Sequence, residues 1–75
     1  MPAQEIEELI KKALPDAEIL LVDTAGDMDH YSVTVSSPSF AGKTRVAQHK
    51  MVMDSLGENM GGRLHALAIT TEVPN

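Results

Sequence analysis

The sequence contains no cysteine and no tryptophan, and only one tyrosine and one phenylalanine among its 75 residues. Without cysteine, this chain supplies neither a disulfide bond nor a thiolate ligand for a metal. With so few aromatic side chains, it also lacks the stacking surfaces on which proteins bind single-stranded nucleic acid. A soft metal bound by this protein would therefore need sulfur from a partner.

Long apolar runs and positive charge are also scarce. No apolar run approaches the roughly 18 residues of a membrane span, and the start of the chain lacks the basic and apolar regions of a signal peptide. We therefore expect a cytoplasmic protein with no membrane partner. Six Lys and Arg against eleven Asp and Glu give a formal net charge of -5, which repels the phosphate backbone of nucleic acids at long range. The length predicts one small domain, residues 1–75.

The spacing of apolar residues predicts the order helix, strand, strand, short helix, helix, strand. The long helices are expected over residues 3–14 and 43–56, the second capped by Gly57, and a short helical turn held by Phe40 is expected within residues 37–42. The strands are expected at residues 17–23, His30–Ser36 and within 60–71. The apolar stripe of helix 3–14 could bind a partner, but a stripe of this width is more typical of a core face.

The two strands joined by a tight turn must be antiparallel, and the third can lie beside either of them because a helix precedes it. Its nearly continuous apolar run predicts the central strand of the sheet. We expect an α+β fold of two layers, a three-stranded sheet with helices on one face, whose uncovered face carries Ser32 and Thr34. The inner stripe of helix 43–56 is expected at Val46, His49, Val52, Met53 and Leu56.

The three histidines have different expected roles. His49 falls on the apolar stripe of a helix, where a packed and hydrogen-bonded structural histidine is the usual explanation. His30 opens a strand after an acidic turn, so it is either an ordinary surface residue or a facultative metal ligand. His65 follows Gly61 and Gly62 at the start of the final strand, where one ring nitrogen can bind a metal while the other is held by a hydrogen bond.

Other candidate sites are weaker. The serines show no nucleophile-elbow pattern and no phosphate-binding glycine loop is present, so an enzyme is disfavoured. The acidic residues Asp23, Asp27 and Asp29 do not have the spacing of an EF-hand and are interpreted as a solvated turn. The basic residues Lys43, Arg45 and Lys50 would contact phosphates in a helix-turn-helix geometry but more commonly form a solvated helix face.

A set of specific residues between positions 30 and 74 resembles the signature of the BolA family. The set comprises Phe40-Ala41-Gly42-Lys43, Arg45-Val46, His49, Val52 and Leu56, then Met60-Gly61-Gly62, His65-Ala66-Leu67-Ala68-Ile69, Thr71 and Pro74. The resemblance implies an α+β fold similar to class II KH domains, in the element order predicted above. It also implies a non-enzymatic partner of monothiol glutaredoxins, acting in iron-sulfur cluster trafficking and in iron or redox homeostasis.

In such complexes a [2Fe-2S] cluster is shared, and the glutaredoxin cysteine and glutathione supply the thiolates. The resemblance assigns one ligand to His65, and for the second, which relatives take from the loop between the first two strands, this chain offers His30. It places the partner-binding surface at Gly61, Gly62, Arg63, His65 and Ala66. The isolated chain is not expected to hold the cluster tightly by itself.

Two alternatives remain open from the sequence. A DNA-binding transcriptional regulator would use Lys43, Arg45 and Lys50, although Gln48 stands where many relatives have an arginine and the Gly-x-x-Gly loop of KH domains is absent. A small interaction domain without a metal role is the other alternative.

Overall fold

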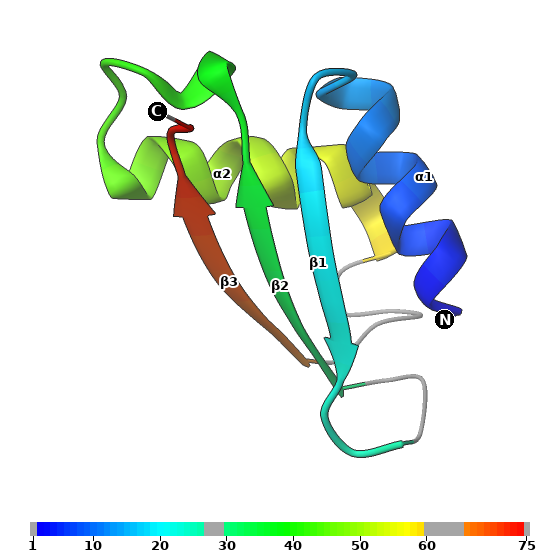
Figure 1. Ribbon diagram of the computed structural model, residues 1–75. Helices are drawn as coiled ribbons and strands as arrows, with labels where there is room; N and C mark the ends of the chain where they lie inside the picture. The colour runs from blue at the N-terminus through cyan, green and yellow to red at the C-terminus, as the bar shows by residue number, and fades with distance from the viewer. Residues whose placement is uncertain (1, 27–29, 60–65, 75) are drawn as a thin grey trace.

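The computed structural model describes residues 2–26, 30–59 and 66–74. It has the predicted element order and confirms the α+β class (Figure 1). The elements are α1 (Ala3–Ala13), β1 (Glu18–Asp23), β2 (His30–Ser36), the short 3-10 helix η1 (Pro38–Phe40), α2 (Arg45–Leu56), a second 3-10 turn η2 (Gly57–Asn59) and β3 (Ala66–Glu72). Each predicted helix and strand is therefore present, with bounds that differ by a few residues.

The sheet has the strand order β1-β2-β3. The predicted hairpin is confirmed, because β1 and β2 pair antiparallel, whereas β2 and β3 pair in parallel. The prediction that the final strand is central was wrong: β2 is the central strand and β3 lies at an edge. The inward residues of β2 explain this, since Tyr31, Val33 and Val35 are at most 2% exposed, as expected for a strand with a neighbour on each side.

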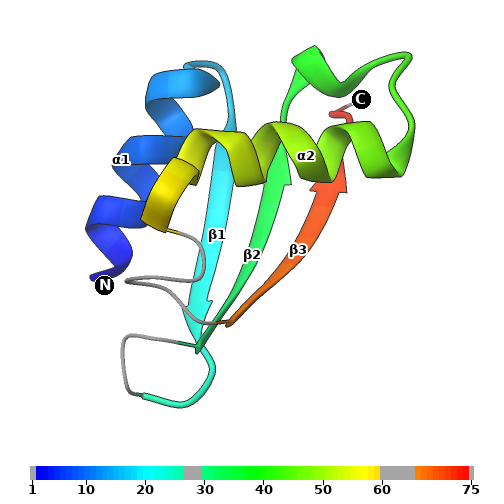
Figure 2. The ribbon, with the colours of Figure 1, turned by 180° about the vertical axis from the view of Figure 1, so that it is seen from behind.

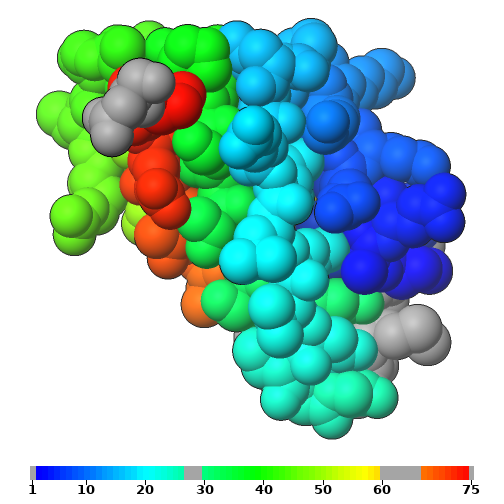
Figure 3. Space-filling model, viewed as in Figure 1, coloured from blue at the N-terminus to red at the C-terminus, as the bar shows by residue number. Residues whose placement is uncertain are grey.

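Both long helices cover the same face of the sheet, and α2 crosses behind the strands (Figures 1 and 2). On the opposite face the strands are open to solvent (Figure 3). This face carries Ser32 and Thr34, which alternate with the buried residues of β2, as predicted. Leu20 on β1 belongs to the same face because it is the register partner of Thr34, and it is 65% exposed.

The core lies between the sheet and the helices. It is formed by buried side chains from α1, the segment that follows it, β2, η1 and α2: Ile6, Ile10, Leu14, Ala17, Tyr31, Val33, Val35, Phe40, Val52 and Leu56. Burying one large aliphatic side chain of this kind contributes roughly 1.5–3 kcal/mol. Phe40 is completely buried, which confirms that η1 is held to the core by this residue.

The predicted inner stripe of α2 was only partly right. Val52 and Leu56 are buried, but Val46 is 79% exposed and Met53 is 45% exposed, so neither belongs to the inner face. The helix is rotated so that Gln48 turns inward, one helical turn before Val52. A polar residue can occupy that place because its hydrogen bonds are satisfied there.

The ends of α2 follow from two local residues. The side chain of Thr44 accepts a hydrogen bond from the backbone N–H of Ala47 and caps the N-terminus. Gly57 caps the C-terminus, as predicted, with φ of 56° and its N–H bonded to the carbonyls of Met53 and Asp54. A positive φ of this kind is open to glycine and strained for residues with a side chain.

Candidate functional site

His30 is the first residue of β2 and is exposed. Its carbonyl oxygen accepts two hydrogen bonds from Thr24, one from the backbone N–H at 2.9 Å and one from the Oγ1 hydroxyl at 3.1 Å. These bonds fix the backbone of His30 at the point where the hairpin opens into its turn. The imidazole is therefore presented from a well-anchored strand end.

The partner of His30 in the sheet register is Ala66, the first residue of β3. Since β2 and β3 run in parallel, both strands begin at the same end of the sheet (Figure 1). His65, Gly61, Gly62 and Arg63 lie outside the described residues. The roles predicted for them stay predictions, and the sequence adds only that His65 is bonded directly to Ala66.

The hairpin turn after β1 is closed by Asp23. Its Oδ1 atom accepts a 2.9 Å hydrogen bond from the backbone N–H of Gly26, which has φ of 70°. This arrangement is an Asx-type turn, in which a short acidic side chain replaces a backbone acceptor. Asp27 and Asp29 lie outside the described residues. Within the described parts of the chain, no three His, Cys, Asp or Glu side chains gather in a way that could hold a metal ion.

His49 lies near the N-terminal end of α2 and is half-buried, as expected for a packed histidine. Together with Arg45, one turn earlier, it lines a hollow of about 240 Å³ against Ile69, Thr70 and Thr71 of β3. Among the described residues, none forms a hydrogen bond with the His49 ring. The structure thus agrees with the packing predicted for His49 but provides no hydrogen-bond partner in the described regions.

The comparison of the chain with known protein families gives one match over almost its full length. The sequence profile of BolA-like proteins matches residues 6–75. This chain belongs to the BolA family. The family fold that the resemblance implied is thereby confirmed, and the α+β structure described above is a BolA fold.

Sequence relatives of this BolA-family protein include two bacterial proteins. A protein from Rickettsia prowazekii, whose solved structure is described as BolA-like, is 38% identical over 69 residues that cover 92% of this chain and 90% of the relative. The DNA-binding transcriptional regulator BolA of Vibrio cholerae is 38% identical over 77 residues, covering 88% of this chain and 73% of the relative.

Solved BolA structures superpose closely on this one. BolA1 from Arabidopsis thaliana has a TM-score of 0.84 at 32% identity, over 96% of this chain and 90% of that protein. The BolA homologue from Coxiella burnetii has a TM-score of 0.82 at 28% identity, over 99% of this chain and 92% of that protein. The BolA fold therefore accounts for the helical layer, the sheet order and the open sheet face together.

The three basic residues predicted to contact phosphates lie on α2 or just before it. Lys43, Arg45 and Lys50 are all exposed, and the Nζ atom of Lys50 pairs with Oδ2 of Asp54 at 3.0 Å. The long helices α1 and α2 are separated in the chain by β1 and β2, so they do not form a helix-turn-helix. If these residues contact phosphates, they do so from α2 and the segment just before it, and not from a helix-turn-helix.

Sequence reasoning missed the structural role of Gln48. Its Nε2 atom donates hydrogen bonds to the carbonyls of Phe40 at 3.1 Å and Lys43 at 2.9 Å, and its Oε1 atom accepts one from the Thr71 hydroxyl at 2.6 Å. This side chain ties the loop before α2 to the end of β3. The signal available in the sequence was its position, four residues before Val52 and eight before Leu56.

None of the described helices combines sufficient length with sufficient apolar character to cross a bilayer.

Proposed function

We propose that this BolA-family protein is a non-enzymatic adaptor that binds a monothiol glutaredoxin and contributes His65 to a shared [2Fe-2S] cluster. In this role it acts in the assembly or trafficking of iron-sulfur clusters and in iron or redox homeostasis. The observation that carries the proposal is membership of the BolA family, combined with a histidine but no cysteine among the residues of the family signature.

The ligands that the chain can offer fit a shared cluster. Iron-sulfur clusters are usually held by cysteine thiolates, and imidazole replaces thiolate on one iron of Rieske-type centres. Because this chain contains no cysteine, its contribution is limited to imidazole, and the thiolates come from the glutaredoxin cysteine and glutathione. His65 of this chain would hold the cluster from one side, and the thiolates of the partner and of glutathione would hold it from the other.

The proposed second ligand is His30. Its exposed position at the start of β2, and its pairing with Ala66 at the start of β3, support this choice because His65 is the residue before Ala66. Two imidazoles contributed from neighbouring strand starts would reach a cluster docked at one end of the sheet. Gly61, Gly62, Arg63 and Ala66 would form the surrounding contact surface with the glutaredoxin.

The test mixes purified protein with a glutathione-loaded, cluster-bearing monothiol glutaredoxin and records visible absorption and circular dichroism. We expect the wild-type protein to change both spectra and His65→Ala to abolish that change. His30→Ala should alter the spectra while leaving complex formation intact. His49→Ala is the matched control, because it removes the third histidine from a half-buried place on α2, and it should behave as wild type once its fold is verified.

Two results would contradict the proposal. If the spectra do not change on adding the wild-type protein, the proposal of a shared cluster is wrong. If His65→Ala changes the spectra as the wild type does, the assignment of His65 as a ligand is wrong. If the NMR signals of residues around Ala66 shift on adding apo-glutaredoxin while no spectral change occurs with the cluster, the protein is an interaction domain without a metal role.

A DNA-binding transcriptional regulator is the second candidate function. It is favoured by the relative from Vibrio cholerae, which is named as one, and by the exposed side chains of Lys43 and Arg45 at the start of α2. This candidate predicts binding to a defined duplex that weakens steeply with salt and that is reduced by Lys43→Gln and Arg45→Gln. No binding at low salt would dismiss it.

A further inference from the structure

The uncovered face of the sheet is a second surface, formed by alternate residues of all three strands. Inward residues of β2 are buried and the residues between them face outward, so the register gives the outward set on the neighbouring strands. That set, called here the open face, comprises Glu18, Leu20, Val22, Ser32, Thr34, Ser36, Ala68, Thr70 and Glu72. No described helix covers it (Figures 1 and 3).

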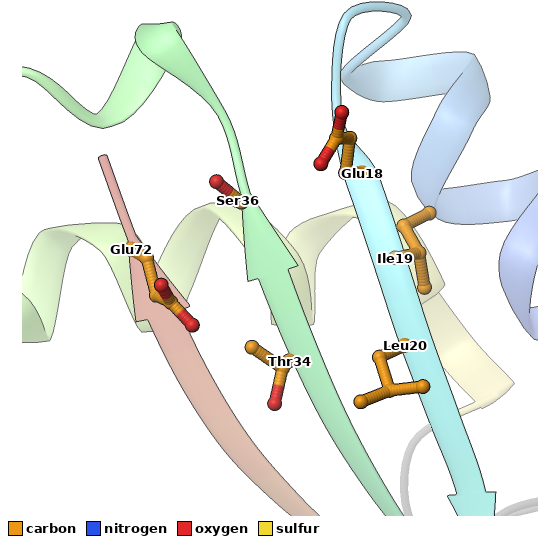
Figure 4. A pocket seen from close by; sticks show the side chains of 6 residues that line it. All are labelled: Glu18, Ile19, Leu20, Thr34, Ser36 and Glu72. Atoms are coloured by element: carbon orange, nitrogen blue, oxygen red, sulfur yellow. The ribbon is translucent and has the colours of Figure 1, made fainter. Parts of the chain in front are cut away.

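The side of the open face formed by β1 is apolar. Leu20 is 65% exposed and Val22 is 49% exposed, and they are consecutive outward residues of β1. Beside Leu20 the face is hollowed by a depression of about 360 Å³, to which Thr34 also contributes. Figure 4 shows Leu20 and Thr34 side by side on neighbouring strands below the acidic end of the depression. Leu20, which lines the depression, and its exposed neighbour Val22 on β1 are the large aliphatic side chains that a docked apolar group would contact.

One end of the open face is acidic. Glu18 and Glu72 are both register partners of Ser36, so the three residues form one row across the sheet (Figure 4). Two strand spacings separate the outer residues of this row by about 10 Å. Both glutamates are exposed, and neither pairs with a cation among the described residues. The three strands carry no lysine or arginine.

The dimensions of the face match one helix. The outer strands lie about 10 Å apart, and a helix with its side chains is about 10–12 Å wide. A single amphipathic helix laid along the strands would cover Leu20 and Val22 with its apolar side. Lysine or arginine at the end near Ser36 would meet Glu18 and Glu72, whose charges have no counterpart on the face.

We propose that the open face docks a basic amphipathic helix of a partner protein, whose apolar side packs on Leu20 and Val22 and whose cationic residues pair with Glu18 and Glu72. This surface is different from the glutaredoxin surface proposed above. Ser36 and His30 stand at opposite ends of β2, about 20 Å apart for a strand of this length.

The test is an NMR titration of ¹⁵N-labelled protein with a synthetic leucine–lysine peptide of about 18 residues that forms an amphipathic helix. Expected are shifts of the amides of β1, β2 and β3 near the open face, with those of α2 unchanged. The same peptide with glutamate in place of lysine should not bind. Raising the salt concentration should weaken binding, because the glutamates are exposed.

Matched variants separate a specific site from general attraction to an acidic protein. Glu18→Gln with Glu72→Gln should weaken peptide binding about three- to tenfold. Glu7→Gln with Glu8→Gln changes the net charge by the same amount on exposed positions of α1 and should change binding less than about twofold. Leu20→Ser should also weaken binding, with circular dichroism confirming the fold, since this side chain is largely in water already.

Three outcomes would overturn the proposal. The first is equal weakening by the two double variants, which would mean that only the net charge attracts the peptide. The second is a shift pattern centred on α1 or α2. The third is a dimer of the free protein in sedimentation that is broken by Leu20→Ser, because a second copy of the chain would then be the occupant of the open face.

Discussion

Gln48 connects three parts of the chain through one side chain. Its amide donates to the carbonyls of Phe40 and Lys43 and accepts from the hydroxyl of Thr71. Because both carbonyls can only accept, the amide orientation is determined by its partners. Because its hydrogen bonds are satisfied, the half-buried Gln48 can lie on the inner side of α2, one turn before the buried Val52.

We predict that Gln48→Ala lowers the free energy of unfolding by about 1–2 kcal/mol, because the carbonyls and the hydroxyl lose their partner at a half-buried position. Urea denaturation followed by far-ultraviolet circular dichroism measures this. Gln4→Ala is the control: Gln4 is exposed and makes a single 3.3 Å hydrogen bond to Glu8, so its loss should change stability by less than about 0.5 kcal/mol.

A double-mutant cycle with Thr71→Val isolates one of these bonds. The coupling free energy between Gln48 and Thr71 should be about 0.5–1.5 kcal/mol, since the two side chains share a 2.6 Å hydrogen bond. Purely additive effects of the two substitutions would show that Gln48 acts through its contacts to Phe40 and Lys43 alone.

Helix α2 shows which of its features could be predicted from the spacing of apolar residues and which could not. The length of the helix, its cap at Gly57 and the inward positions of Val52 and Leu56 all follow from spacing and residue type. Its rotation about its axis does not, since Val46 and Met53 are apolar but exposed. The hydrogen bonds that satisfy Gln48 on the inner side of the helix involve residues eight and twenty-three positions away.

Met53 and Leu56, near the C-terminal end of α2, test this rotation. Leu56→Ala should reduce the free energy of unfolding by about 2–5 kcal/mol, because Leu56 is 1% exposed. Met53→Ala should change it by less than about 0.5 kcal/mol, because Met53 is 45% exposed. A loss for Met53→Ala comparable to that for Leu56→Ala would return Met53 to the inner face and contradict the described rotation.

The last strand illustrates a second limit. Its apolar run predicted the central strand of the sheet, covered on at least one face, but the strand lies at the edge, with the outward position Ala68 exposed and Ile69 only half-buried. Alanine is small enough to suit either side of a sheet, so it does not distinguish an edge strand from a central one. The same limit applies to the candidate site. His30 and His65 could be chosen as candidates from the sequence, but only the strand register shows that His30 pairs with Ala66.

Over the whole molecule, charged residues are distributed differently on the helices and on the open face of the sheet. The helices α1 and α2 carry lysine and arginine together with the acidic residues Glu5, Glu7, Glu8 and Asp54. The open face carries Glu18 and Glu72 near the exposed Leu20, and its strands have no lysine or arginine. In this chain of net charge -5, the described elements therefore carry acidic groups on both sides and lysine and arginine on the helices alone. A cationic partner would meet no lysine or arginine on the strands, and its attraction to Glu18 and Glu72 would extend about one Debye length, roughly 8 Å at physiological salt.

The strand order itself can be tested in solution by amide hydrogen exchange. A central strand bonds to a neighbour on each side, so we predict that the amides of β2 are protected along its whole length. In β1 and β3 only the amides directed at β2 should be protected, which gives slow and fast exchange at alternate residues. The slowest β2 amides should report global unfolding, about 4–11 kcal/mol for a domain of this size. Uniform protection along β3, with alternation in β2, would instead make the last strand central and overturn the order β1-β2-β3.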